Sequence, residues 1–89
     1  ERPVTPEIEV PSADDKKFDV IRRATEFFLS QGLNVLTIDG ARIEFPDGWG
    51  LLRASNTAPK LVVRVEAETP ARVKQILSMI ETTVGELNK

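Results

Sequence analysis

The chain contains no cysteine and no histidine, and aromatic residues make up only 6% of it. The lack of cysteine excludes disulfides and thiolate nucleophiles, and the lack of histidine removes the commonest zinc ligand and the usual general base near neutral pH. No stretch is long and apolar enough to span a bilayer, and the first residues lack the basic start and apolar middle of a signal peptide. We therefore expect a soluble, cytoplasmic protein that does not contact a membrane.

The charge balance limits the range of partners. Lysine and arginine number 12 against 14 aspartate and glutamate, which gives a net charge of -2 and a pI near 5.1. Dedicated nucleic-acid binders neutralise several phosphates with clustered cations, and RNA binders add exposed aromatic side chains. The composition argues against nucleic acid as a partner, but a single phosphate could still be held locally.

The length of 89 residues leaves room for one small domain. Prolines at positions 3, 6 and 11 lie among charged residues, so we expect residues 1–11 to form a linker or hinge from a preceding domain, with a short edge strand over residues 8–10 at most. Residues 12–89 would form the domain proper. Because the chain starts at Glu1 rather than methionine, we expect a fragment of a longer polypeptide.

Two amphipathic helices are expected. The first begins near Asp14, after a capping pattern at residues 12–15, and ends at Gly32. Its predicted outer face includes Lys16 and Lys17, and its predicted core face consists of Phe18, Ile21, Thr25, Phe28 and Leu29. The second follows the Thr69-Pro70 cap and carries an apolar stripe of Val73, Ile76, Leu77, Ile80, Val84 and Leu87.

Four strands are expected between the helices, over residues 34–38, 41–45, 49–52 and 60–67. The first two are joined by a two-residue Asp39-Gly40 turn, and Trp49 and Leu51 are assigned to the buried face. A four-stranded antiparallel sheet with one apolar face needs helices packed on that face. The fold class is therefore α+β, a two-layer sandwich with the order α-β-β-β-β-α and a possible short N-terminal edge strand.

A short polar segment, R-A-S-N-T-A-P at residues 53–59, separates the last two strands. The Arg53 guanidinium can donate two bonds to an oxyanion, and Ser55, Asn56, Thr57 and turn N–H groups can fill the remaining acceptor sites. The alternative is an ordinary turn with a solvated charge.

The other charged residues near this segment are left outside the site. Lys60 and Arg64 on the following strand are interpreted as surface cations. The acidic residues Asp14, Asp15 and Asp39 have cap or turn roles, so we predict no metal site.

Three stretches resemble the C-terminal domain of the α-D-phosphohexomutases, of the bacterial phosphomannomutase/phosphoglucomutase type. They are D-G-A-R-I-E-F-P-D-G-W-G-L-L-R-A-S-N-T-A-P at residues 39–59, L-V-V-R-V-E-A-E-T at 61–69 and T-P-E-I at 5–8. The resemblance implies a TBP-like fold and makes Arg53, Ser55, Asn56 and Thr57 the residues that bind the substrate phosphate not being transferred. Asn56 resembles this type rather than the phosphoglucosamine type, and Ala58 stands where many relatives carry glutamate.

The same resemblance implies an isomerase of carbohydrate metabolism with four domains around one cleft. The full enzyme would interconvert hexose 1-phosphate and hexose 6-phosphate through a bisphosphorylated sugar, with Mg²⁺ and glucose 1,6-bisphosphate required but no cofactor held by this fragment. The fragment would not be catalytic, its partners would be the hexose phosphate and the other domains of the same chain, and the enzyme would be a monomer. The competing hypothesis is a stand-alone α+β module that binds protein or nucleic acid.

Overall fold

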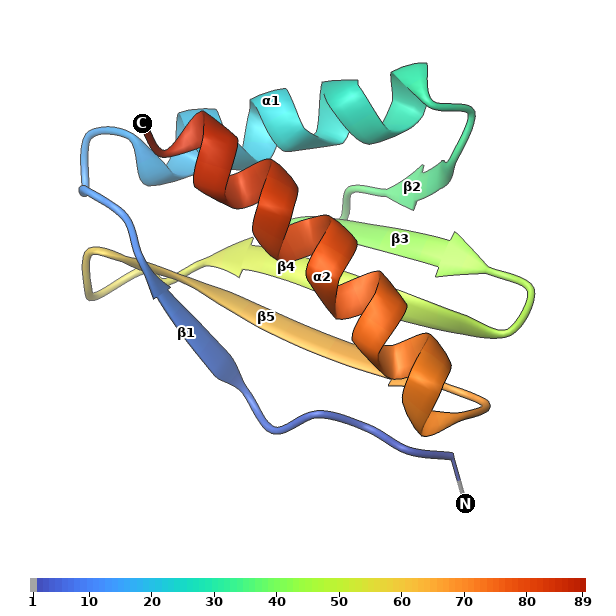
Figure 1. Cartoon of the computed structure of the whole chain (residues 1–89). Helices are drawn as coiled ribbons and strands as arrows, with labels where there is room; N and C mark the ends of the chain where they lie inside the picture. Colours follow the sequence, from blue (N-terminus) through green and yellow to red (C-terminus); the bar gives the residue numbers. More distant parts are fainter. Residues whose placement is uncertain (1) are drawn as a thin grey trace.

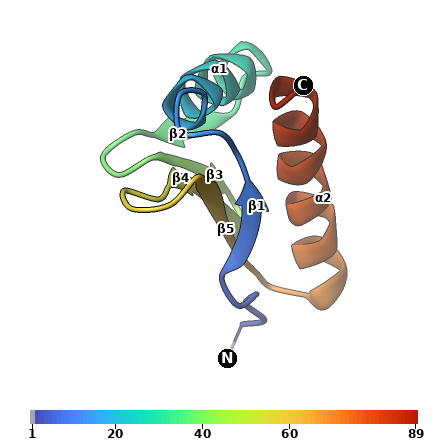
Figure 2. The same cartoon turned by 90° about the vertical axis from the view of Figure 1, so that its left-hand side faces the viewer.

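The computed structural model describes residues 2–89, in which two helices cover one face of an antiparallel sheet. The strands lie in the order β1-β5-β4-β3-β2. Figure 1 shows α2 crossing the sheet, and the view in Figure 2 shows both helices on the same side of it. In chain order the elements are β1 (Ile8–Pro11), α1 (Lys17–Ser30), β2 (Asn34–Leu36), β3 (Ala41–Phe45), β4 (Gly48–Ala54), β5 (Lys60–Ala67) and α2 (Pro70–Leu87).

The predicted α+β class is confirmed, but in residues 2–89 the sheet has five strands rather than four. The additional strand is β1, which forms at the position of the possible edge strand and pairs with β5 from Ile8 opposite Val63 to Pro11 opposite Lys60. Pro11 is tolerated there because an edge strand leaves one row of backbone groups unpaired. The observed order is therefore β-α-β-β-β-β-α.

Helix α1 begins later than predicted and without a capping box. Its N-cap residue, Lys16, makes no side-chain cap bond, and the carbonyl of Ala13 accepts hydrogen bonds from the N–H groups of Lys16 and Lys17. The hydroxyl of Ser12, which we expected to cap the helix, donates instead to Asn88 Oδ1 at 2.8 Å. A turn over residues 13–16 precedes the helix, and the Ser12 side chain bonds to the C-cap residue of α2 instead of capping α1.

The buried face of α1 also differs from the predicted one. Lys17, Val20, Ala24 and Phe28 are buried, whereas Phe18 is 59% and Leu29 is 51% exposed. The prediction favoured the largest apolar side chains, but the core instead contains the short side chain of Ala24. Lys17 lies on the same stripe, so it is buried rather than exposed.

Strand β4 presents its glycines to the helices, which reverses the predicted face. Gly48, Gly50 and Leu52 are buried, and Trp49 and Leu51 are half-buried on the opposite, helix-free face. A Cβ at Gly50 would lie 2.4 Å from Ile80 Cδ1 and 3.0 Å from Ile76 Cγ2. Helix α2 packs so closely on β4 that a side chain at Gly50 would have to displace the end of the Ile80 side chain. The tryptophan is left on the open face under the guanidinium of Arg42, 4.4 Å from its ring centre.

Helix α2 matches its prediction. The Thr69 side chain accepts a hydrogen bond from the Arg72 N–H with proline at the first turn, as expected of the cap. Ile76, Ile80 and Val84 are buried, and the rest of the predicted stripe packs against the core. Within residues 2–89, neither helix is long and apolar enough to cross a membrane.

The turn between β2 and β3 packs against the strand that carries Arg53. Strand β2 ends at Leu36, so the connection covers residues 37–40 and is longer than the predicted two-residue turn. Gly40 has φ of 86°, and a Cβ there would lie 2.4 Å from the Leu52 carbonyl oxygen and 2.8 Å from Arg53 Cβ. Glycine at this position therefore allows the turn to reach β4.

Gly40→Ala should lower the free energy of unfolding by about 2–5 kcal/mol, the sum of left-handed backbone strain and overpacking against β4. Gly32→Ala is the matched control because Gly32 has a similar φ of 79° but no atom within 4 Å of an added Cβ. It should cost about 1–2 kcal/mol. Urea denaturation measures both, and equal losses would show that the close approach at Gly40 carries no energetic weight.

Candidate functional site

The predicted anion-binding residues lie at the end of β4 and in the loop that follows. Residues 55–59 connect β4 to β5 and are called the β4–β5 loop below. Arg53 pairs with Val62 across the two strands. Because side chains alternate along a strand, Arg53 shares the open face of the sheet with Trp49 and Leu51. The paired strands, rather than the loop, therefore set the direction of Arg53.

The β4–β5 loop is folded by hydrogen bonds of its own. The Ser55 Oγ accepts from the N–H groups of Thr57 at 3.3 Å and Ala58 at 3.2 Å. At the base of the loop, the Ser55 N–H donates to the Lys60 carbonyl at 3.0 Å, and the Lys60 N–H donates to the Ala58 carbonyl at 2.8 Å. Ser55 thus organises the backbone of the loop, as serine and threonine commonly do in turns.

Arg53, Ser55, Asn56 and Thr57 line one pocket of about 390 Å³. Within residues 2–89 the side chains of Asn56 and Thr57 have no hydrogen-bond partner, so their donors remain open to a ligand. The pocket is completed by Glu7, Ala58, Lys60 and Val62. The structure therefore brings together all four residues that the sequence singled out.

The guanidinium of Arg53 is only loosely paired with a carboxylate. Arg53 Nη2 lies 3.6 Å from Glu7 Oε2, and the two side chains are 36% and 52% exposed. Such an exposed pair contributes little to stability, so a phosphate could replace the carboxylate at small cost. Lys60, which we interpreted as a surface cation, lines the pocket and pairs with Glu9, whereas Arg64 lies opposite Leu51 and does not line it.

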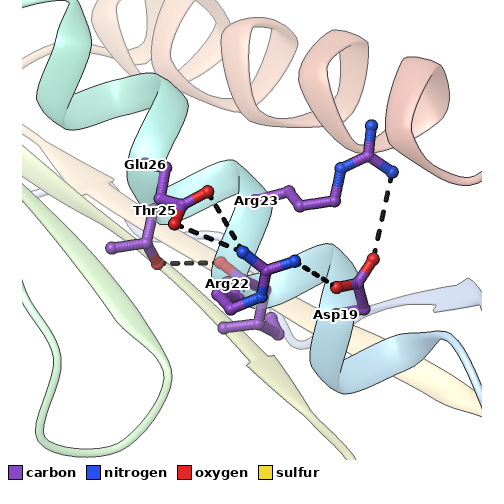
Figure 3. Close-up of polar contacts among 6 residues, drawn as sticks. Asp19, Arg22, Arg23, Thr25 and Glu26 are labelled. Atoms are coloured by element: carbon purple, nitrogen blue, oxygen red, sulfur yellow. Dashed lines mark hydrogen bonds and ion pairs between the residues drawn. The ribbon is translucent and has the colours of Figure 1, made fainter.

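A second cation near the loop, Arg22, is held by carboxylates of its own helix. It lines an adjacent pocket of about 430 Å³ that also reaches Arg53 and Asn56. Figure 3 shows Arg22 between Asp19, at 2.6 Å, and Glu26, at 3.2 Å. The hydrogen bond and negative charge of Asp19 raise the pKa of Arg22 above its ordinary value. Arg53 is therefore the better candidate for an external anion.

Two residues that the sequence reasoning missed contact the loop from the segment before α1 and from the first residue of that helix. Lys17 Nζ donates to the Ala58 carbonyl at 2.9 Å, and the Ser12 N–H donates to the Pro59 carbonyl at 2.9 Å. In Figure 1 this segment and the β4–β5 loop lie at the same end of the molecule. The spacing of Lys17 from Val20 and Ala24 is helical, so its place on an apolar stripe could have identified it.

Comparison with known proteins connects this geometry to a family. Residues 7–83 match the family model described as phosphoglucomutase/phosphomannomutase, C-terminal domain. The chain is 46% identical over 72 residues to a phosphomannomutase/phosphoglucomutase of Pseudomonas syringae pv. tomato, an alignment that covers 81% of this chain and 16% of that protein. It is 41% identical over 73 residues to a phosphoglucosamine mutase of Methanococcus aeolicus, covering 76% of this chain and 15% of that protein.

Comparison with a solved structure indicates the same family. A phosphoglucomutase/phosphomannomutase family protein from Burkholderia thailandensis superposes with a TM-score of 0.75 and 35% sequence identity, covering 98% of this chain and 18% of that chain. The chain thus spans less than a fifth of the length of these relatives. On the match of residues 7–83, this chain belongs to the phosphoglucomutase/phosphomannomutase C-terminal domain family.

Proposed function

We propose that Arg53, Ser55, Asn56 and Thr57 bind the phosphate group of a hexose phosphate. The observation that carries the proposal is their convergence on one pocket at the end of β4, in a chain of this family. A guanidinium donates two parallel hydrogen bonds to phosphate oxygens, and the hydroxyl and amide groups supply neutral donors to the others. The relatives named above are sugar-phosphate mutases, and none of their names favours the alternative of an interaction module.

We infer that the bound phosphate is the one that is not transferred. The hydroxyls of Ser55 and Thr57 have no histidine to activate them, since the chain contains none. Within this chain, the pocket therefore supplies donors for binding rather than an activated nucleophile. Holding one phosphate at a fixed place orients the sugar and uses remote binding energy to favour reaction at its other end.

We place this chain in a larger enzyme that interconverts hexose 1-phosphate and hexose 6-phosphate through a bisphosphorylated sugar. No group of three or more His, Cys, Asp or Glu side chains in residues 2–89 could hold a metal ion, so Mg²⁺ would have to be bound by another part of such an enzyme. The hinge over residues 1–11, the domain over residues 12–89, the role of glucose 1,6-bisphosphate, the monomeric state and the cytoplasmic location stay predictions.

Ser55 has two roles in this proposal, because its oxygen accepts from two loop N–H groups while its own hydrogen can point to the phosphate. Ser55→Ala should speed amide hydrogen exchange at Thr57 and Ala58 and weaken phosphate binding. Ser55→Thr keeps the oxygen and should restore both. Asn56→Ala should weaken binding alone, since the Asn56 side chain makes no bond within residues 2–89. NMR measurement of amide exchange with water at Thr57 and Ala58 tests whether Ser55 organises the loop. Unchanged exchange in Ser55→Ala would contradict that role.

Arg53→Ala in the larger enzyme should lower kcat/KM by about 10- to 100-fold, mainly through a raised KM for the hexose phosphate. The estimate corresponds to about 1.5–3 kcal/mol for hydrogen bonds to a charged group. Arg23→Ala is the matched control, since it removes the same charge from an exposed position on α1 outside the pocket. Steady-state kinetics measure both, and an Arg53→Ala enzyme that behaves like the control would remove Arg53 from the site.

A further inference from the structure

Lys17 is a buried cation that the proposed phosphate contacts do not use. Its side chain is 5% exposed, on the stripe of α1 that also buries Val20 and Ala24. Burying an ammonium group is costly unless charged and polar partners compensate for the lost water. Within residues 2–89, Lys17 has two hydrogen-bonding partners, the Asp14 carboxylate at 2.8 Å and the Ala58 carbonyl at 2.9 Å, and its ammonium also lies 5.4 Å from the centre of the Phe18 ring. The second partner ties the buried charge to the β4–β5 loop.

The Ala58 carbonyl is held from two sides. It accepts from the Lys17 ammonium and from the Lys60 N–H at 2.8 Å, and the next carbonyl, of Pro59, accepts from the Ser12 N–H. Two consecutive carbonyls of the loop are therefore turned toward the β1–α1 connection. This orientation matters in a pocket lined by Ala58, because a carbonyl oxygen pointing into the pocket would repel a phosphate.

Lys17 acts on the loop by holding its backbone, rather than by attracting the phosphate electrostatically from a distance. Lys17 does not line the pocket, and Asp14, 2.8 Å from its ammonium, offsets its charge at a distance. A charge-assisted hydrogen bond to Ala58 is stronger than the neutral bonds that hold the rest of the loop. Removing it would leave the Ala58 carbonyl with the Lys60 N–H bond alone, which loosens the peptide group after Ala58 while the strands on either side stay paired.

We propose that Lys17 is a positioning residue for phosphate binding, which acts through the Ala58 carbonyl to hold the β4–β5 loop in its binding conformation. This inference rests on the proposed function of the loop. It adds a residue from α1 to a site whose other members come from β4 and the loop after it. Asp14 serves Lys17 in turn, because its carboxylate compensates the charge of the ammonium.

The test compares glucose 1-phosphate binding to the chain and to four variants by amide NMR titration. Lys17→Met removes the ammonium and keeps the apolar stem, and Lys16→Met makes the same change at the exposed neighbouring residue. Ile80→Val destabilises the core without contacting the loop, which separates stability from positioning. Lys17→Arg keeps a charged donor. We expect Lys17→Met to raise the Kd about tenfold and to broaden the signals of residues 55–60, Lys17→Arg to recover part of the loss, and the other two to bind like the parent chain.

The outcomes separate the two proposals. A folded Lys17→Met that binds glucose 1-phosphate as tightly as the parent overturns the positioning role and leaves the phosphate site intact. A parent chain that does not respond overturns the phosphate site and the positioning role together. If Lys17→Met does not fold, the Lys17 ammonium resonance of the parent chain decides: it should shift along the same saturation curve as the loop amides, and a resonance unchanged at saturation overturns the role.

Discussion

The antiparallel pairing of β4 with β5 determines where the donors of the candidate site lie. The register places Arg53 opposite Val62 and leaves residues 55–59 as the loop between the strands. Because side chains alternate, a slip of one residue would turn Arg53 toward the helices and Leu52 toward water. Leu52 and Val63 pair across these strands and are fully buried, so the slip would expose the core. Hydrophobic packing on one face of the sheet thus fixes the direction of a charged side chain on the other face.

The loop itself is stabilised from two sides. Internally, the Ser55 oxygen gathers the N–H groups of Thr57 and Ala58. Externally, Ser12 and Lys17 hold the carbonyl groups at its exit. Ser12 lies in the connection between the edge strand β1 and helix α1, and Lys17 is the first residue of α1, so a movement of the segment that enters the domain would be transmitted to the loop. The proposed hinge in residues 1–11 would therefore act next to the proposed phosphate site.

Local features were predictable from the sequence, whereas features set by packing were not. The Thr69 cap, the apolar stripe of α2 and the polar loop after Arg53 depend on residues close in the chain, and each matches the structure. The buried face of β4 depends on how closely α2 approaches, and the pattern of Trp49 and Leu51 contains no information on that distance. The position of Arg53 does indicate which face is buried. Arg53 lies four residues after Trp49 and two after Leu51, so the three side chains share one face, and a charged side chain favours the face away from the core. The burial of Lys17 follows from its helical spacing from Val20 and Ala24. The prediction overlooked this spacing because it assigned the largest apolar side chains to the core.

Amide NMR titration of the chain with glucose 1-phosphate tests the central claim most directly, with glucose and a short oligonucleotide titrated in parallel. The phosphate site predicts saturable shifts confined to residues 53–60, caused by glucose 1-phosphate and by neither of the other two. Shifts centred on another surface, shifts caused equally by glucose, or binding of the oligonucleotide at the loop would contradict it. So would amides that stay unchanged across residues 53–60 up to high millimolar glucose 1-phosphate.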